Sequence, residues 1–237
     1  CVANDVRGIC AGGGTPTKLN LIEYVTIASK GNASGFGDLT ENRSMGGGSG
    51  SPTRGIIMGG GSPTATHQNI IEYLTIETRG NAQDFGDLSN AARTRTANFS
   101  SPTRAVVAGG YVDPSPGNTD HIDYVTIATK GNASDFGNMT SAREGCGGAS
   151  SHVRGLIAGG TGAVNTIEYV TIATTGNATD FGDLTRTAGS LSAAASATRA
   201  VFANGGTNTI DYVTIATTGN ATDFGDTTAV RGQAGGV

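Results

Sequence analysis

Chemistry-bearing side chains gather in segments that vary between otherwise repeated stretches of this chain. We take seven of them as candidate ligand-binding residues: Lys18, His67, Gln68, Tyr111, Asp113, Asp120 and His121. An aromatic face with hydrogen-bonding groups beside it is suited to binding a sugar. Variable loops on a rigid scaffold are also the usual place for binding. The alternative is that these side chains are solvated loop residues without a ligand, and the sequence leaves both readings open.

Other motifs resemble sites of catalysis or metal binding. Asp-Phe-Gly occurs at 84–86, 135–137, 180–182 and 223–225. A protein kinase uses one such motif to hold magnesium, but repetition without a nucleotide-binding loop indicates a structural motif. Paired acids such as Asp180 and Asp183 suit either calcium binding or a tight turn, and their repetition favours the turn. We expect no catalytic residue, no metal ligand and no cofactor, with calcium as the open alternative.

The cysteines do not form a disulfide framework, because there are 3 of them. Cys10 lies in an apolar run and is expected to be a small buried hydrophobic residue. A bridge from Cys146 to either Cys1 or Cys10 is the alternative. The sequence has no initiator Met and no visible signal peptide, so we expect a processed product or a domain of a longer polypeptide.

Composition excludes several classes of protein. Glycine accounts for 39 of 237 residues and charged residues for 14%, against a usual charged share of about 25%. Disordered chains usually carry more charge than this. No apolar run approaches the length of a membrane-spanning helix, so no membrane insertion is expected. The net charge is −4 and the basic residues are scattered, so no nucleic-acid partner is expected.

The repeated stretches are copies of one unit of about 45–50 residues, a length found in β-propeller blades. The units lie near 7–53, 54–103, 104–153, 154–198 and 199–237 plus 1–6. Each holds an arginine before an apolar run and a glycine pair, then an acid before tyrosine, then a phenylalanine before glycine. We take these as structural blade residues: Arg7, Arg54, Arg104, Arg154, Arg199, Glu23, Glu72, Asp123, Glu168, Asp211, Phe36, Phe85, Phe136, Phe181 and Phe224. We expect the arginines and acids to pair, as Arg54 with Glu72 or with an acid of the neighbouring unit.

Each unit predicts four short strands. One example is a small-residue strand at 143–150, followed by an apolar strand at 154–158, an alternating strand at 167–172 and a strand around 180–184. A Gly-Asn turn joins the last two, and a repeated four-stranded unit is typical of a propeller. The sequence therefore predicts an all-β fold, a single domain over 1–237 and a five-bladed β-propeller with four antiparallel strands per blade.

The end of the chain suggests how such a ring would close. Residues 228–236 are similar to 140–148, the segment that leads into a small-residue inner strand. The C-terminal segment therefore supplies the piece that the first unit lacks. We expect the C-terminal inner strand to pair with the N-terminal blade, which hides exposed strand edges.

The unit resembles the kelch motif, with Arg54 to Gly60, Glu72-Tyr73 and Phe85 showing it well. Kelch units usually carry Trp where Phe stands here, so the resemblance is to a divergent member. Residues 211–226 also look like a repeat common in predicted proteins of marine bacteriophages, thought to be tail-fibre or other virion components.

These resemblances imply a non-catalytic, extracellular binding domain of a phage virion. Its variable rim would bind a host cell-surface glycan or protein, with other virion proteins as further partners. A purely structural, self-assembling module is the first alternative, and a carbohydrate-active enzyme is the second.

Overall fold

The structure, a computed structural model, describes residues 1–14, 16–63, 67–112, 117–162 and 164–231. Every regular element within these ranges is a β-strand, which confirms the prediction of an all-β fold. The strands form five four-stranded sheets and one smaller sheet, and all pairings are antiparallel. None of the described ranges contains a helix long and apolar enough to cross a membrane.

The five larger sheets follow one another along the chain and are numbered here in that order. Sheet one contains β1 (Val2–Ala3), β2 (Arg7–Ala11), β3 (Leu19–Thr26) and β4 (Ser34–Arg43). Sheet two contains β5 (Gly47–Gly50), β6 (Arg54–Met58), β7 (Ile70–Thr75) and β8 (Gln83–Asp87). Sheet three contains β10 (Ala97–Ser100), β11 (Arg104–Ala108), β14 (His121–Thr126) and β15 (Ser134–Asn138). Sheet four contains β16 (Gly147–Ser150), β17 (Arg154–Ala158), β18 (Thr166–Thr171) and β19 (Thr179–Asp183). Sheet five contains β20 (Leu191–Ala195), β21 (Arg199–Asn204), β22 (Thr209–Thr214) and β23 (Thr222–Asp226).

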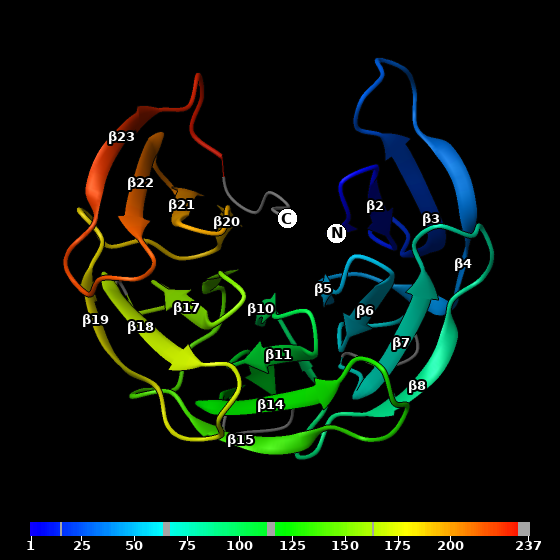
Figure 1. Cartoon of the computed structure of the whole chain (residues 1–237), viewed down its shortest axis with the longest axis horizontal. Helices are drawn as coiled ribbons and strands as arrows, with labels where there is room; N and C mark the ends of the chain where they lie inside the picture. The colour runs from blue at the N-terminus through cyan, green and yellow to red at the C-terminus, as the bar shows by residue number, and fades with distance from the viewer. Residues whose placement is uncertain (15, 64–66, 113–116, 163, 232–237) are drawn as a thin grey trace.

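The sheets are arranged around a central axis as an open ring (Figure 1). In each sheet the first strand lies nearest the axis and the fourth at the periphery. Small residues suit the crowded inner strands: Ser100 Oγ donates to Gly50 O at 2.7 Å, and Ser150 Oγ donates to Ser100 O at 2.8 Å. These bonds join the inner strands of neighbouring sheets.

An opening separates sheet one from sheet five (Figure 1). The residues expected to close the ring, 232–237, lie outside the described residues. The innermost strand of sheet one is β1, which spans only 2 residues. On the two sheets that flank the opening, Ile27 is 56% and Phe224 is 54% exposed.

The hydrophobic core lies between consecutive sheets. Phe136 of sheet three packs with Ile157, Val170 and Ile172 of sheet four in one buried cluster. Within each sheet the repeated Tyr and Phe make an edge-to-face pair, such as Tyr169 and Phe181 with ring centroids 6.1 Å apart. Such pairs add about 0.5–1.5 kcal/mol beyond the area they bury. Each sheet interface is therefore built from the same few side chains.

The expected pairing of the repeated arginine with the repeated acid is wrong. Arg154 lies over the ring of Tyr169, 4.4 Å from its centroid, and donates to Ile215 O of the next sheet at 2.9 Å. Glu168 is bound instead by Arg143, at 2.9 Å, with both side chains buried. The reason is position: Arg154 sits at the start of its strand, beside the tyrosine, whereas Arg143 precedes the inner strand and reaches the interior.

The same buried ion pair recurs in four sheets. Its members are Arg43–Glu72, Arg93–Asp123, Arg143–Glu168 and Arg186–Asp211. A β-bulge precedes the acid in each of these sheets, and a bulge re-aims the side chain that follows it. Burial lowers the pKa of the Arg43 and Arg93 guanidinium groups, while the neighbouring carboxylates oppose that shift. The pairs hold the end of one sheet against the next.

The Asp-Phe-Gly motif is explained by a close approach of backbones. At Gly137 the φ angle is +143°, and an added Cβ would lie 2.5 Å from Gly176 O of the following sheet. The Gly176 amide in turn donates to Phe136 O at 2.7 Å. Any larger side chain at this position would separate two neighbouring sheets.

The segment between the second and third strands of sheet three adds short strands: β12 (Tyr111–Val112) pairs with β13 (Gly117–Asn118) as a hairpin, and also with β9 (Arg93–Thr94). The expectation that Cys10 is buried is wrong. Cys10 is exposed, because sheet one has no neighbour across the opening, and its Sγ lies 2.8 Å from Cys1 Sγ. Cys146 is buried and all three thiols are free, so the alternative of a bridge from Cys146 to Cys1 or Cys10 is not found.

Candidate functional site

The candidate site lies on the rim where the loops between second and third strands meet the links between sheets. Ser44, in the link from sheet one to sheet two, exchanges two backbone hydrogen bonds with Gly61, at 2.9 and 3.0 Å. The Gly60 amide donates to Arg93 O at 2.9 Å. These backbone contacts fix the loop ends, so the variable side chains project from a rigid base.

A pocket of about 330 Å³ opens on this rim, near the lower end of the size range of small-ligand sites. Its lining residues are Lys18, Ser44, Met45, Gly61, His67, Thr94, Arg95 and Tyr111. Three of the seven residues expected to bind a ligand therefore meet here, from the loops of three consecutive sheets. The structure brings Lys18, His67 and Tyr111 together although they are far apart in sequence.

The pocket has an aromatic wall. The rings of His67 and Tyr111 lie 5.4 Å apart with a tilt of 35°. Tyr111 is 39% exposed, so part of its ring is open to a ligand. The tyrosine is fixed by its backbone, since it pairs with Thr94 of β9 and with Asn118 of β13. The hairpin thus holds this aromatic side chain at the pocket.

Basic groups complete the pocket. Lys18 Nζ donates to Ser62 O at 2.8 Å, which places its charge at the edge. Arg95 Nη1 lies 3.2 Å from Glu144 Oε1, and its side chain remains 42% exposed. The lining residues within the described ranges include no carboxylate. The arrangement is therefore suited to a polar or anionic ligand that offers a face to an aromatic ring.

Sequence reasoning missed Arg95. Its φ is +56°, a left-handed backbone that is strained for a residue other than glycine. The equivalent residues are Met45 in the preceding link and Gly145 in the following one. Their backbones form a ladder: Arg95 N donates to Met45 O at 3.2 Å, and Gly145 N donates to Arg95 O at 2.8 Å. Comparison of the three repeats shows a charged residue, Arg95, at a position that is glycine in another repeat. That comparison could have indicated Arg95 from the sequence alone.

Three of the expected ligand-binding residues lie within the described ranges but are not part of this pocket. Gln68 is buried and donates to Glu41 Oε2 at 2.6 Å, linking sheets two and one. His121 lies in β14 with its Nε2 atom 3.1 Å from Asp123 Oδ1, so it supports the buried acid. Asp120 is half-buried and its carbonyl accepts the Met139 amide at 2.7 Å. Asp113 lies outside the described residues.

The repeated acids take part in turns. Asp135 Oδ1 accepts the amide of Gly137 at 3.0 Å, and Asp223 Oδ1 accepts that of Gly225 at 2.9 Å. Across the part of the chain that the structure describes, no group of three His, Cys, Asp or Glu side chains comes together as a metal site. A second pocket, of about 180 Å³, lies on the axis and is lined mainly by Gly, Ala and Ser of the inner strands.

Comparison with known proteins gives no family for this chain. No protein-family model matches it, and no curated protein matches it significantly.

Proposed function

We propose that this chain is a non-catalytic binding domain whose variable rim binds a host-surface glycan at the Lys18–His67–Tyr111 pocket. The single observation that carries the proposal is the convergence of these three side chains, from loops of three sheets, around one rim pocket. A ligand here would lie against the exposed face of Tyr111 and take hydrogen bonds from Lys18 and Arg95. Few, well-placed polar groups beside an aromatic wall are the usual composition of a small-ligand site.

The proposal includes the fold and the setting expected from the sequence. We take the five sheets as blades of a five-bladed β-propeller, closed between sheet one and sheet five, with the loops of one rim as the binding surface. The phage-virion setting, a tail fibre or a related part, is supported by the resemblance of residues 211–226 to phage repeats. Other virion proteins are proposed as further partners.

The experiment is a binding screen of the whole chain against glycans and bacterial surfaces, with and without EDTA. We expect saturable binding that EDTA leaves unchanged and that Tyr111→Ala and Lys18→Ala each weaken at least tenfold. The control is His152→Ala, because His152 is an exposed loop histidine outside the pocket. Loss of binding in EDTA would instead support calcium, and binding that survives both pocket substitutions would refute the site.

A second candidate function is a self-assembling structural module of the virion. The observation that favours it is the exposure of large apolar side chains on the two sheets beside the opening, with Ile27 at 56% and Phe224 at 54%. Exposed apolar patches commonly mark interaction surfaces. That function predicts concentration-dependent assembly and no glycan binding. The carbohydrate-active enzyme stays a third candidate; it needs an acid pair in the central channel, and the described residues that line the axial pocket include no acid.

A further inference from the structure

Sheet one carries two cysteines that face each other across neighbouring strands. β1 and β2 are paired so that Val2 lies opposite Ile9. One step further along the same register, Cys1 lies opposite Cys10. Their sulfur atoms are 2.8 Å apart, and both residues are exposed. Two thiols in contact and open to solvent are a candidate site of covalent modification.

The backbone places the two cysteines where a cross-strand disulfide can form. The Asn4 amide donates to Arg7 O at 3.0 Å, and hydrogen-bonded and non-hydrogen-bonded pairs alternate along antiparallel strands. Three steps from that bond, Cys1 and Cys10 form a non-hydrogen-bonded pair. The Cα atoms of such a pair are about 4.5 Å apart, within the range of about 4.4–6.8 Å found for disulfides. The bond can therefore form without a rearrangement of the strands.

Sheet one differs from the other sheets at this place. The equivalent cross-strand pairs are Gly48–Ile57, Asn98–Val107, Gly148–Ile157 and Ala193–Phe202. The second member of each is apolar and packs in a buried cluster shared with the preceding sheet. Cys10 has no such cover, because the opening lies on that side of sheet one (Figure 1). The position leaves both thiols accessible to an oxidant.

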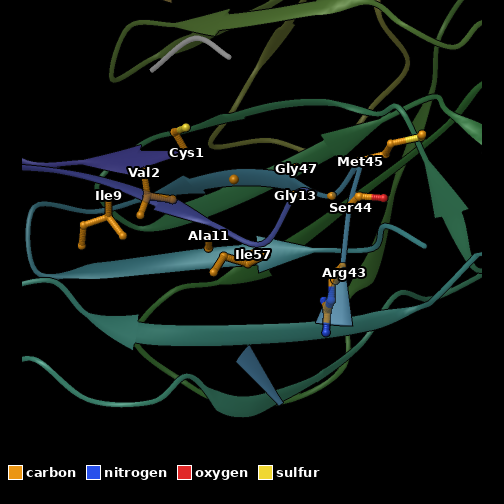
Figure 2. Close-up of a pocket in the computed structure, with 12 residues that line it drawn as sticks. Cys1, Val2, Ile9, Ala11, Gly13, Arg43, Ser44, Met45, Gly47 and Ile57 are labelled. Carbon is orange, nitrogen blue, oxygen red and sulfur yellow. The ribbon is translucent and has the colours of Figure 1, made fainter. Parts of the chain in front are cut away.

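The strand that Cys1 precedes has few contacts to hold it in place. β1 spans 2 residues, whereas the inner strands of the other sheets span 4 or 5. A cavity of about 100 Å³ lies beside it, and Figure 2 shows Cys1, Val2 and Ile9 around this cavity. Side chains that line a void lack partner atoms on that side. A covalent link would therefore add much to the attachment of β1.

The position of β1 matters for the junction with sheet two. Val2 is 4% exposed and belongs to the same buried cluster as Ile57. An added Cβ at Gly48 would lie 2.5 Å from Cys1 O, and one at Gly55 would lie 2.7 Å from Val2 Cγ2. The inner strands of sheets one and two therefore fit closely only while β1 stays in place.

We infer that Cys1 and Cys10 form a reversible disulfide, which links β1 covalently to β2 and fixes the inner strand of sheet one. The oxidant is itself a disulfide, such as oxidised glutathione. One cysteine attacks it as a thiolate, which forms a mixed disulfide and releases one thiol. The other cysteine then attacks the sulfur of the first and displaces the second thiol. Two hydrogen atoms pass from the protein to the oxidant, whose disulfide becomes two thiols.

Other fates of these thiols fit the structure less well. Cys146 is buried, and burial raises the pKa of its thiol to about 12, so it stays protonated and unreactive near neutral pH. Structural zinc sites use four ligands, and among the described residues no third His, Cys, Asp or Glu joins the pair. The disulfide does not depend on the proposed glycan binding.

Peptide mapping tests the bond on the unmodified chain. The chain is incubated with oxidised glutathione, blocked with iodoacetamide in urea so that Cys146 is also capped, and digested with trypsin, which cuts after Arg7 between the two cysteines. We expect peptides 1–7 and 8–18 to be joined, with a mass two hydrogen atoms below their sum. Dithiothreitol should separate them and return both thiols to the free form of the structure, which iodoacetamide then labels.

Three results of the mapping would overturn the inference. They are alkylated or glutathione-bound cysteines on separate peptides, a linkage from either peptide to the one that contains Cys146, and a covalent dimer of chains on a non-reducing gel.

Thermal unfolding tests what the bond does. The oxidised chain should melt about 5–10 °C above the reduced chain, because the bond closes the segment 1–10 in the unfolded state. Cys10→Ser should lose this dependence on dithiothreitol. Cys146→Ala is the matched control, since it keeps the pair, and should retain the dependence. Equal melting temperatures for the two forms, with the bond verified by mass, would overturn its role in fixing β1.

Discussion

Glu168→Gln is the substitution that probes the repeated ion pair most directly. Both Glu168 and Arg143 are buried, with side-chain exposures of 0% and 2%, and their charged atoms lie 2.9 Å apart. The amide keeps the shape of the side chain but removes its charge, which leaves the Arg143 guanidinium as an uncompensated buried cation. Its remaining bond, from Nη1 to Gly159 O at 3.0 Å, does not neutralise that charge.

The expected cost is about 3–5 kcal/mol, the usual effect of removing one partner of a buried ion pair. For a chain of this size, about 1 kcal/mol lowers the melting temperature by about 2–4 °C, so the loss is about 6–20 °C. Urea unfolding followed by circular dichroism measures the loss of unfolding free energy. Glu77→Gln is the control, because Glu77 is exposed and such substitutions change stability by only about 0.5 kcal/mol. A loss below about 1 kcal/mol for Glu168→Gln would refute the assignment of the pair as a support of the sheet junction.

Three further substitutions or reactions test separate parts of the account. Gly137→Ala should destabilise the chain by several kcal/mol, since its Cβ would lie 2.5 Å from Gly176 O; a neutral effect in urea unfolding would show that the two sheets do not approach so closely. Burial raises the pKa of the Cys146 thiol to about 12, so iodoacetamide at pH 9 should alkylate the two exposed cysteines and spare Cys146 until the chain unfolds. Because the unfolded thiol loses its proton first, stability should also fall as the pH rises from 9 towards 12, and Cys146→Ala should lack that part of the fall. Arg95→Gly should keep or raise the melting temperature, because glycine accepts the φ of +56°, while it weakens ligand binding; a fall in the melting temperature would contradict the strain at this position.

The repeated parts of the molecule could be predicted from the sequence. Strands and turns are local features, and the alternation around Tyr169 and the Gly-Asn turn specify them in every unit. The pairing of Glu168 could not be predicted in the same way. It depends on the bulge before Glu168, which turns the acid inward to Arg143, and sequence distance favoured Arg154 instead.

Only part of the candidate site could be predicted, because it also depends on contacts between residues far apart in the sequence. Lys18, His67 and Tyr111 stand in variable loops, and their meeting follows from the spacing of the sheets around the axis. His121 stands in a segment that looks equally variable, but it begins β14 and is held by Asp123. Arg95 could be found only by comparing its link with the equivalent link that carries Gly145, because the left-handed backbone at this position shows in that comparison and not in the local sequence. Loop composition therefore indicated the rim but not which side chains line the pocket.

The measurement that tests the central claim most directly is saturation-transfer NMR of the chain with a glycan selected from the binding screen. The account predicts transfer to the sugar face that lies against an aromatic ring, abolished by Tyr111→Ala and retained in His152→Ala. Transfer that is unchanged in Tyr111→Ala, in a variant with an unaltered melting temperature, would contradict the claim that this rim pocket is the binding site.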